Sequence, residues 1–213
     1  MQEQVSDLAR FLSLAPPLVL TGAGRGFCAG ADLSEFDFRP GDDLMSRADP
    51  GPVIDQAFNP TTRRLMAVRV PTVCAVNGVA AGAGASVAMA CDIAIAAPGA
   101  SFIQAFSKIG LVPDSGGTWL LPQRVGLARA MALAMTGDKL GALEAKAMGM
   151  IWDVADDSVD AAKKMAERLA AMPTKALIAT RHLLRNAHTH SLDEQLDLER
   201  DVQSRLGFTH DYI

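Results

Sequence analysis

Short apolar runs, rather than amphipathic stripes, dominate the first half of the chain. Residues 18–20, LVL, follow two prolines and are too short and too apolar for a surface element, so they predict a buried strand. Similar runs at 72–76 and 93–96 predict two more strands, and residues 101–105 are a further candidate. The first half therefore predicts a sheet of buried strands.

Apolar residues in the second half recur every three or four positions, the period of an amphipathic helix. Ser191 and Glu194 form a capping-box pattern at the start of the last predicted helix, which stops before Gly207. Strands alternating with helices, followed by helices alone, indicate an α/β core over residues 1–139 and a helical region over 140–213. The predicted helices are 4–14, 61–68, 85–90, 126–135, 143–148, 159–171, 175–185 and 191–206.

Residues 36–59 form a long polar stretch with scattered Pro, Gly and Asp. This pattern predicts a mobile loop, with a helix resuming near Pro60. Long irregular loops in compact domains often serve as lids or binding segments.

Composition narrows the class of protein. The chain has 213 residues, 49% of them apolar and 21% charged, which is ordinary for a globular protein. A net charge of −4 without a Lys/Arg run argues against a nucleic-acid surface, and the absence of a long unbroken apolar stretch argues against a membrane span. The start lacks a signal-peptide pattern, and Cys28, Cys74 and Cys91 lie far apart. We expect a cytoplasmic protein without disulfides or a metal site.

Two familiar motifs fit parts of the sequence poorly. Residues 24–29 match the GxGxxA of a dinucleotide-binding loop, but a Pro- and Asp-rich stretch follows where that motif needs a helix and an acidic second strand. Ser86 in GASVA resembles a hydrolase nucleophile, but glycines interrupt the strand that should lead into it. His188 and His190 have no evident third metal ligand.

Two glycine-rich loops, GFCAGAD and NGVAAGAG, each follow a predicted strand. Loops of Gly and Ala let a ligand approach the backbone closely. The second loop runs into a helix, whose first N–H groups lack internal acceptors. One N–H from each loop could hold a carbonyl oxygen as it becomes an oxyanion. Close packing of a helix on a strand explains the glycines equally well.

Four segments carry a family resemblance: FCAGADL at 27–33, NG with GAG at 77–84, ACDIA at 90–94 and IGLVPDSGGT at 109–118. In this order they resemble the enoyl-CoA hydratase/isomerase (crotonase) superfamily over nearly the whole chain. The resemblance implies an α/β, ClpP-like superhelix of β-β-α units, with residues 140–213 as a trimerisation region of a homotrimer or hexamer. Family members usually begin with a strand pair that is not seen here, so we expect a truncated chain or omitted segments.

The resemblance also implies a site. It places the two oxyanion-hole amides at Ala31 and Ala83. It places contacts to the coenzyme A moiety at Ala29, Ala31, Asp32 and Leu33.

Family hydratases carry two glutamates where this chain has Ser86 and Phe106, so the resemblance points away from simple hydration. Asp114 matches the aspartate of dienoyl-CoA isomerases and of the ring-epoxide isomerases of phenylacetate degradation. The segment QAFSKIGLVPDSGGTWLLP is most similar to the latter, the 2-(1,2-epoxy-1,2-dihydrophenyl)acetyl-CoA isomerases. The N-cap of a helix starting at Ser115 is the structural alternative for Asp114.

We therefore hypothesise an acyl-CoA isomerase in which Asp114 is the only general acid/base. It would shift a double bond or open a ring epoxide while two main-chain amides hold the enolate oxygen. No cofactor is expected beyond the coenzyme A of the substrate. An enoyl-CoA hydratase with relocated acids, and a catalytically silent crotonase-like scaffold that binds a partner, are the alternatives.

Overall fold

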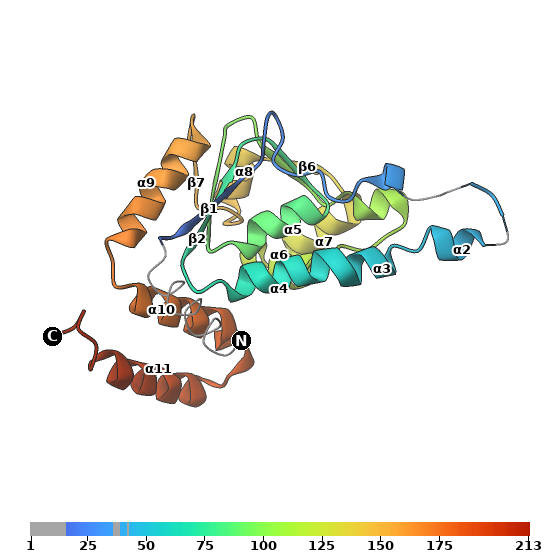
Figure 1. The fold of residues 1–213 in the computed structure, drawn as a ribbon. Helices are drawn as coiled ribbons and strands as arrows, with labels where there is room; N and C mark the ends of the chain where they lie inside the picture. The colour runs from blue at the N-terminus through green and yellow to red at the C-terminus, as the bar shows by residue number, and fades with distance from the viewer. Residues whose placement is uncertain (1–15, 36–38, 42) are drawn as a thin grey trace, which may run out of the picture. The chain divides into compact units, whose positions relative to one another are not determined.

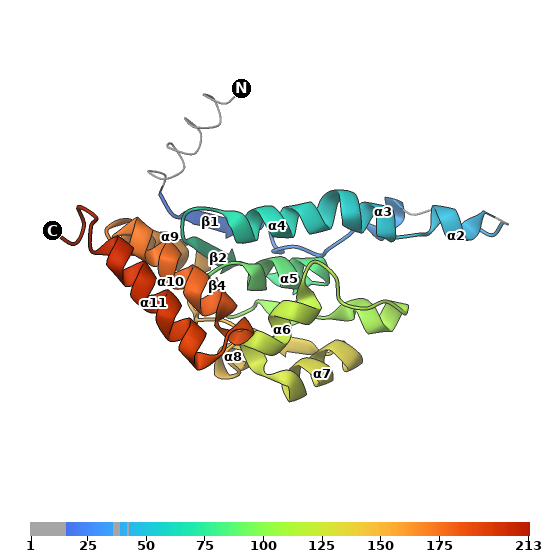
Figure 2. The same cartoon turned by 90° about the horizontal axis from the view of Figure 1, so that it is seen from below.

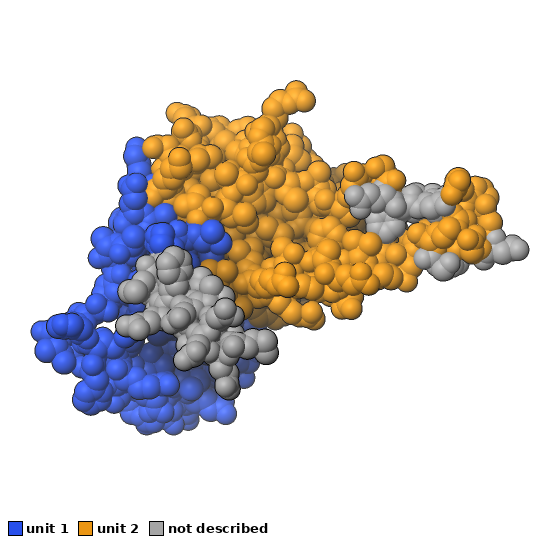
Figure 3. All heavy atoms as spheres, viewed as in Figure 1, with its two compact units in different colours: residues 1–18, 69–72, 164–213 blue, residues 19–68, 73–163 orange. Residues whose placement is uncertain are grey.

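The computed structural model describes residues 16–35, 39–41 and 43–213. The helix predicted at 4–14 and part of the predicted loop at 36–59 lie outside the described residues. The chain divides into two compact units, shown in different colours in Figure 3. Unit 1 comprises residues 1–18, 69–72 and 164–213, and unit 2 comprises residues 19–68 and 73–163. The predicted division at residue 139 stays a prediction.

One sheet has four strands in the order β1, β2, β4, β7. β2 pairs with β4, and β4 with β7, in parallel. All five residues of β2 are buried, as expected for a parallel strand covered on both faces. The strand bounds are Leu18–Thr21 for β1, Thr72–Val76 for β2, Ile93–Ala96 for β4 and Asp153–Val154 for β7.

A second sheet consists of β3 (Val79–Ala81), β5 (Ser101–Ile103) and β6 (Lys139–Gly141). β3 and β5 are parallel, and β5 and β6 antiparallel. The chain therefore runs through β2, β3 and helix α5 (Ala83–Ala90), then through β4, β5 and helix α6 (Gly117–Val125). These two β-β-α units confirm the predicted fold class.

Helix α5 lies in the middle of unit 2. It packs against α4 (Asn59–Ala67) and against α6, which in turn packs on α7 (Leu127–Thr136), as Figures 1 and 2 show. Every residue of α5 except Val87 is buried. Its small side chains, AGASVAMA, let the neighbouring elements approach closely. Close packing against α4, α6 and β3 therefore holds helix α5 in place.

The predicted helices of the second half are confirmed with small shifts at their ends. Ser191 Oγ accepts the N–H of Glu194 at 3.3 Å, and Glu194 Oε2 accepts the N–H of Ser191 at 2.8 Å, so the capping box is present. Across the residues described, no helix combines the length and apolar character needed to cross a bilayer. The remaining bounds are Ala142–Ala147 for α8, Ser158–Ala170 for α9, Thr174–Asn186 for α10 and Leu192–Leu206 for α11.

Two predictions of local structure are wrong. Strand β1 is not buried: it is the edge strand of its sheet, and Leu18 is 40% exposed. The segment predicted as a loop up to Asn59 contains α2 (Leu44–Arg47), α3 (Gly51–Val53) and a π-helical turn that runs into α4. Pro60 has no N–H to donate to the preceding turn, so a local change of hydrogen-bond register is expected there.

Candidate active site

The first glycine-rich loop is hydrogen-bonded to strand β3. The N–H groups of Phe27 and Cys28 donate to Val79 O at 3.0 and 3.1 Å, and Ala81 N–H donates to Cys28 O at 2.9 Å. Gly30 follows with a φ of +88°, and a Cβ placed on it would lie 3.3 Å from Ala83 N. The residue next to Ala31 therefore lies against the backbone of Ala83, so the structure brings the two predicted loops together.

The second loop ends at the N-terminus of helix α5. Gly82 has a φ of +53°, and its N–H donates to Ile103 O at 2.9 Å. Ala83 is the first residue of the helix, where N–H groups have no intrahelical acceptor and the helix dipole is positive. A Cβ on Gly84 would overlap the carbonyl of Cys28, so only glycine permits this approach of helix and loop.

Asn77, which directly follows strand β2, binds the backbone of the first loop through its side chain. Sequence analysis missed this contribution. Its Oδ1 accepts the N–H of Gly22 at 3.1 Å. Its Nδ2 donates to Gly24 O at 3.0 Å and to Gly26 O at 3.2 Å. Asn before Gly is a turn signal, but its partners lie more than 50 residues away and leave no local pattern.

Asp114 lies beside helix α5, and two hydrogen bonds to its backbone carbonyl hold it there. Its carbonyl oxygen accepts Gly117 N–H at 2.7 Å and the Ser86 hydroxyl at 3.0 Å. Burial raises the pKa of the Asp114 carboxyl, against the opposing effect of the Ser115 hydroxyl, which donates to Oδ1 at 3.0 Å. The N-cap alternative is wrong: α6 begins at Gly117 and its N-cap is Gly116, with a φ of +82°.

Ser115 has a φ of +52°, the only positive φ among the described residues other than glycine. Such a conformation costs of the order of 1–3 kcal/mol and persists only where the surroundings enforce it. Here the Thr62 hydroxyl donates to Ser115 O at 3.2 Å, and the Ser115 side chain holds the carboxyl of Asp114. The strained turn therefore fixes the direction in which Asp114 leaves the backbone.

Ser86 and Phe106 converge on the same region. Ser86 is fully buried, and its hydroxyl donates a hydrogen bond to the Asp114 carbonyl. Phe106 is 7% exposed, and its Cζ lies 3.6 Å from the point where a Cβ on Gly82 would be. Positions 86, 106 and 114 thus come together around the start of α5, and only Asp114 carries a carboxyl.

The residues predicted to contact coenzyme A lie on the accessible side of the first loop. Ala29, Asp32 and Leu33 are exposed. Asp32 Oδ1 accepts the Ser34 hydroxyl at 2.7 Å and the Ser34 N–H at 2.9 Å, which lowers the pKa of Asp32. Within the described part of the chain, no group of three or more His, Cys, Asp or Glu is arranged to hold a metal ion.

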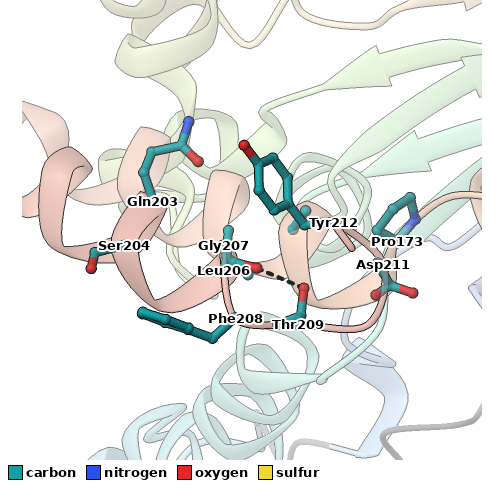
Figure 4. A pocket seen from close by; sticks show the side chains of 10 residues that line it. Pro173, Gln203, Ser204, Leu206, Gly207, Phe208, Thr209, Asp211 and Tyr212 are labelled. Atoms are coloured by element: carbon teal, nitrogen blue, oxygen red, sulfur yellow. Dashed lines mark hydrogen bonds between the residues drawn. The ribbon is translucent and has the colours of Figure 1, made fainter.

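A separate hollow lies in unit 1, with a volume of about 690 Å³. Figure 4 shows its lining at the end of α11 and the residues that follow, where the Thr209 hydroxyl donates to Leu206 O at 2.7 Å. Phe208 and Tyr212 are 83% and 80% exposed. The hollow contains none of the predicted site residues, all of which belong to unit 2.

Comparisons with known proteins agree with the geometry. A family model described as "Enoyl-CoA hydratase/isomerase" matches residues 15–212. The chain is 51% identical over 197 residues to the 1,2-epoxyphenylacetyl-CoA isomerase of Escherichia coli K12, covering 92% of this chain and 74% of that protein. It is 40% identical over 213 residues to a protein of Rhodobacter capsulatus named a probable enoyl-CoA hydratase, covering 99% and 80%.

Solved structures show the same likeness. The crystal structure of an enoyl-CoA hydratase from Polaromonas sp. JS666 superposes with a TM-score of 0.84 and 31% identity. The superposition covers 96% of this chain and 79% of that one.

Proposed function

The chain belongs to the enoyl-CoA hydratase/isomerase family, and within it we propose an acyl-CoA isomerase whose single acid/base group is Asp114. One observation carries the proposal: where positions 86, 106 and 114 converge beside the start of α5, the side chains are a hydroxyl, a phenyl ring and one carboxyl. Transfer of a proton between two carbons needs one group that accepts and returns it.

The proposed oxyanion hole consists of the N–H groups of Ala31 and Ala83. Two main-chain donors aimed at the thioester oxygen stabilise the negative charge that develops when a proton leaves the neighbouring carbon. A Cβ placed on Gly30 would lie 3.3 Å from Ala83 N, and this close approach supports the pairing of the two loops. The positive end of the α5 dipole adds to the same effect.

With a 3-enoyl thioester, Asp114 removes a proton from C2, and the electron pair moves into the enolate held by the two amides. Return of the electron pair forms the C2–C3 double bond, and Asp114 delivers its proton to C4. With a ring-epoxide thioester, the product is an oxepin thioester of the same composition. Burial raises the pKa of Asp114, which makes the carboxylate a stronger base and keeps it suited to both halves of the transfer.

The E. coli relative's name supports a ring-epoxide thioester of an arylacetyl group as the substrate. We further propose that Ala29, Ala31, Asp32 and Leu33 contact the coenzyme A moiety, that no metal or redox cofactor takes part, and that the protein assembles as a homotrimer or hexamer through residues 140–213. Hydration is the second candidate, favoured by the name of the Rhodobacter relative.

A panel of three thioesters tests the proposal: a ring-epoxide arylacetyl-CoA, a straight-chain 3-enoyl-CoA and crotonyl-CoA. Each reaction is followed by liquid chromatography coupled to mass spectrometry, because an isomer has the mass of its substrate and is recognised only by a new retention time. The proposal expects a product of unchanged mass from at least one of the first two, and slow or no addition of water to crotonyl-CoA. Addition of water as the only reaction would replace the isomerase with the hydratase. Absence of any turnover, with thioester binding retained, would favour a silent scaffold.

A further inference from the structure

The turn that carries Asp114 is held by one hydroxyl from each of two helices. Ser86 of α5 donates to the Asp114 carbonyl at 3.0 Å. Thr62 of α4 donates to the next carbonyl along the chain, that of Ser115, at 3.2 Å. Because α4 and α5 pack against each other, the two hydroxyls belong to one framework. The Ser115 hydroxyl in turn donates to Asp114 Oδ1 at 3.0 Å, which links Thr62 to the carboxyl through one residue.

Thr62 uses its hydroxyl differently from the neighbouring threonine. Within a helix, a threonine hydroxyl commonly donates to the carbonyl four residues earlier. Thr61 follows this pattern, since its Oγ1 donates to Ala57 O at 2.7 Å on an exposed part of the helix. Thr62 is half-buried, and it donates instead to the turn at Ser115, 53 residues away in sequence. Its hydroxyl therefore supports the turn rather than its own helix.

The turn needs this support because two successive residues have a left-handed backbone. Gly116, with a φ of +82°, adopts it readily, whereas Ser115, with a φ of +52°, does so only where its surroundings enforce it. Thr62 also reaches the turn with its methyl group, because its Cγ2 lies 3.6 Å from the point where a Cβ on Gly116 would be. Without the Thr62 hydroxyl, the peptide after Ser115 is free to rotate, and the Ser115 side chain turns away from the carboxyl.

We propose that Thr62 is a positioning residue for the general acid/base, acting on the Asp114 carboxyl through Ser115. The inference rests on the proposed function, which gives Asp114 its acid/base role. Thr62 takes no part in the proton transfer itself. It fixes the direction of the carboxyl and the hydrogen bond to Oδ1. A carboxylate that moves a proton between two carbons needs this accuracy, since a misplacement of about 1 Å lowers a rate about 10²-fold.

No charged side chain offers another way of setting the state of this carboxyl. Burial raises the pKa of Asp114, the Ser115 hydroxyl and the Asp114 main chain lower it, and no charged group of the described residues contributes. Helix α5 carries no charged residue. On α4, α6 and the 3₁₀-helix Ala105–Ile109, the charged side chains are exposed or bound elsewhere: Arg63, Arg64 and Lys108 are exposed, and Arg124 donates to Met89 O and Cys91 O.

Three substitutions on α4 test the proposal with the best thioester of the panel. Thr62→Val keeps the methyl contact and removes the hydroxyl, Thr62→Ser keeps the hydroxyl, and Thr61→Val is the matched control. In Thr62→Val, kcat is expected to fall about tenfold or more with KM within about twofold. Thr62→Ser and Thr61→Val should keep nearly the unaltered kcat. A normal kcat in Thr62→Val, or a loss that Thr62→Ser shares in full, overturns the proposal.

The route through Ser115 is tested by the pH profile. Loss of the Ser115 hydrogen bond raises the pKa of Asp114, so the acidic limb of kcat/KM should move to higher pH in Thr62→Val. Adding Thr62→Val to Ser115→Ala should move the limb no further than Ser115→Ala alone, because both changes remove the same hydrogen bond. A limb that stays in place in Thr62→Val, or shifts that add in the double variant, overturns this route.

A titration without turnover separates this inference from the proposed function. The ¹³C NMR signal of the Asp114 carboxyl, assigned by its loss in Asp114→Asn, is followed against pH in the unaltered protein and the α4 variants. Its midpoint is expected to be higher in Thr62→Val than in the unaltered protein, Thr62→Ser and Thr61→Val. Equal midpoints overturn the inference. If the unaltered protein isomerises no thioester, the proposed function fails, yet the titration still decides whether Thr62 acts on the carboxyl.

Discussion

Replacing Gly84 with alanine is expected to cost far more activity than stability. The added Cβ would overlap the backbone carbonyl of Cys28, which cannot rotate away as a side chain can. Overpacking of this kind costs about 1–3 kcal/mol. Alanine recovers about 1 kcal/mol of helix propensity within α5. The net loss is therefore about 2 kcal/mol at most, a fall in Tm of about 4–8 °C for a chain of this size.

The effect on catalysis follows from what the overlap displaces. Moving residues 27–31 away from α5 separates the Ala31 and Ala83 amides, and a misplacement of about 1 Å lowers a rate about 10²-fold. Gly99→Ala is the matched control, since nothing lies within 4 Å of its added Cβ and its φ is ordinary. Steady-state kinetics and calorimetry on both variants give the answer. A Gly84→Ala protein with the kcat and Tm of Gly99→Ala would refute the reasoning.

Three further predictions concern the amide donor and the carboxyl. Ala83→Pro removes one main-chain N–H donor at the first position of a helix, where proline is tolerated, so kcat should fall about 10²–10³-fold with thioester binding retained. An unchanged kcat would rule out the Ala83 N–H as an oxyanion donor. Ser115→Ala removes the hydroxyl that lowers the pKa of Asp114, so the acidic limb of the kcat/KM profile should move to higher pH; a limb that stays or moves down contradicts this. Because folding raises the pKa of Asp114 above its unfolded value, its contribution to stability falls as pH rises through the folded pKa. Asp114→Asn should therefore raise Tm at pH 7, by an amount that shrinks toward about pH 4, near the unfolded pKa of an aspartate; a lower Tm at pH 7 contradicts this.

Sequence analysis located the strands that lie between residues typical of turns, such as Pro, Gly and Asn. β2 follows Pro71 and ends before Asn77-Gly78, and its predicted and observed bounds agree. β3, β6 and β7 have two or three residues each, too few to show a period, and they form only because partners distant in sequence pair with them.

The site, too, depends on contacts between residues distant in sequence, which local patterns do not predict. Family resemblance supplied the positions of Asp114 and the two loops, but local pattern suggested a helix N-cap at Asp114, and the observed cap is Gly116. The left-handed turn at Ser115 depends on Thr62 from another helix. No local rule predicts a positive φ at a serine, because contacts made over long sequence separations enforce it.

The central claim is that one carboxyl, at position 114, carries the proton in an acyl-CoA isomerisation. Turnover of the best thioester of the panel by Asp114→Asn tests it most directly, since asparagine keeps the shape and the acceptor for the Ser115 hydroxyl. Asp193→Asn, an exposed carboxyl at the start of α11, is the matched control. The account predicts no detectable isomerisation by Asp114→Asn, normal turnover by Asp193→Asn and thioester binding by both. Isomerisation by Asp114→Asn at a rate near that of the unaltered protein would contradict it.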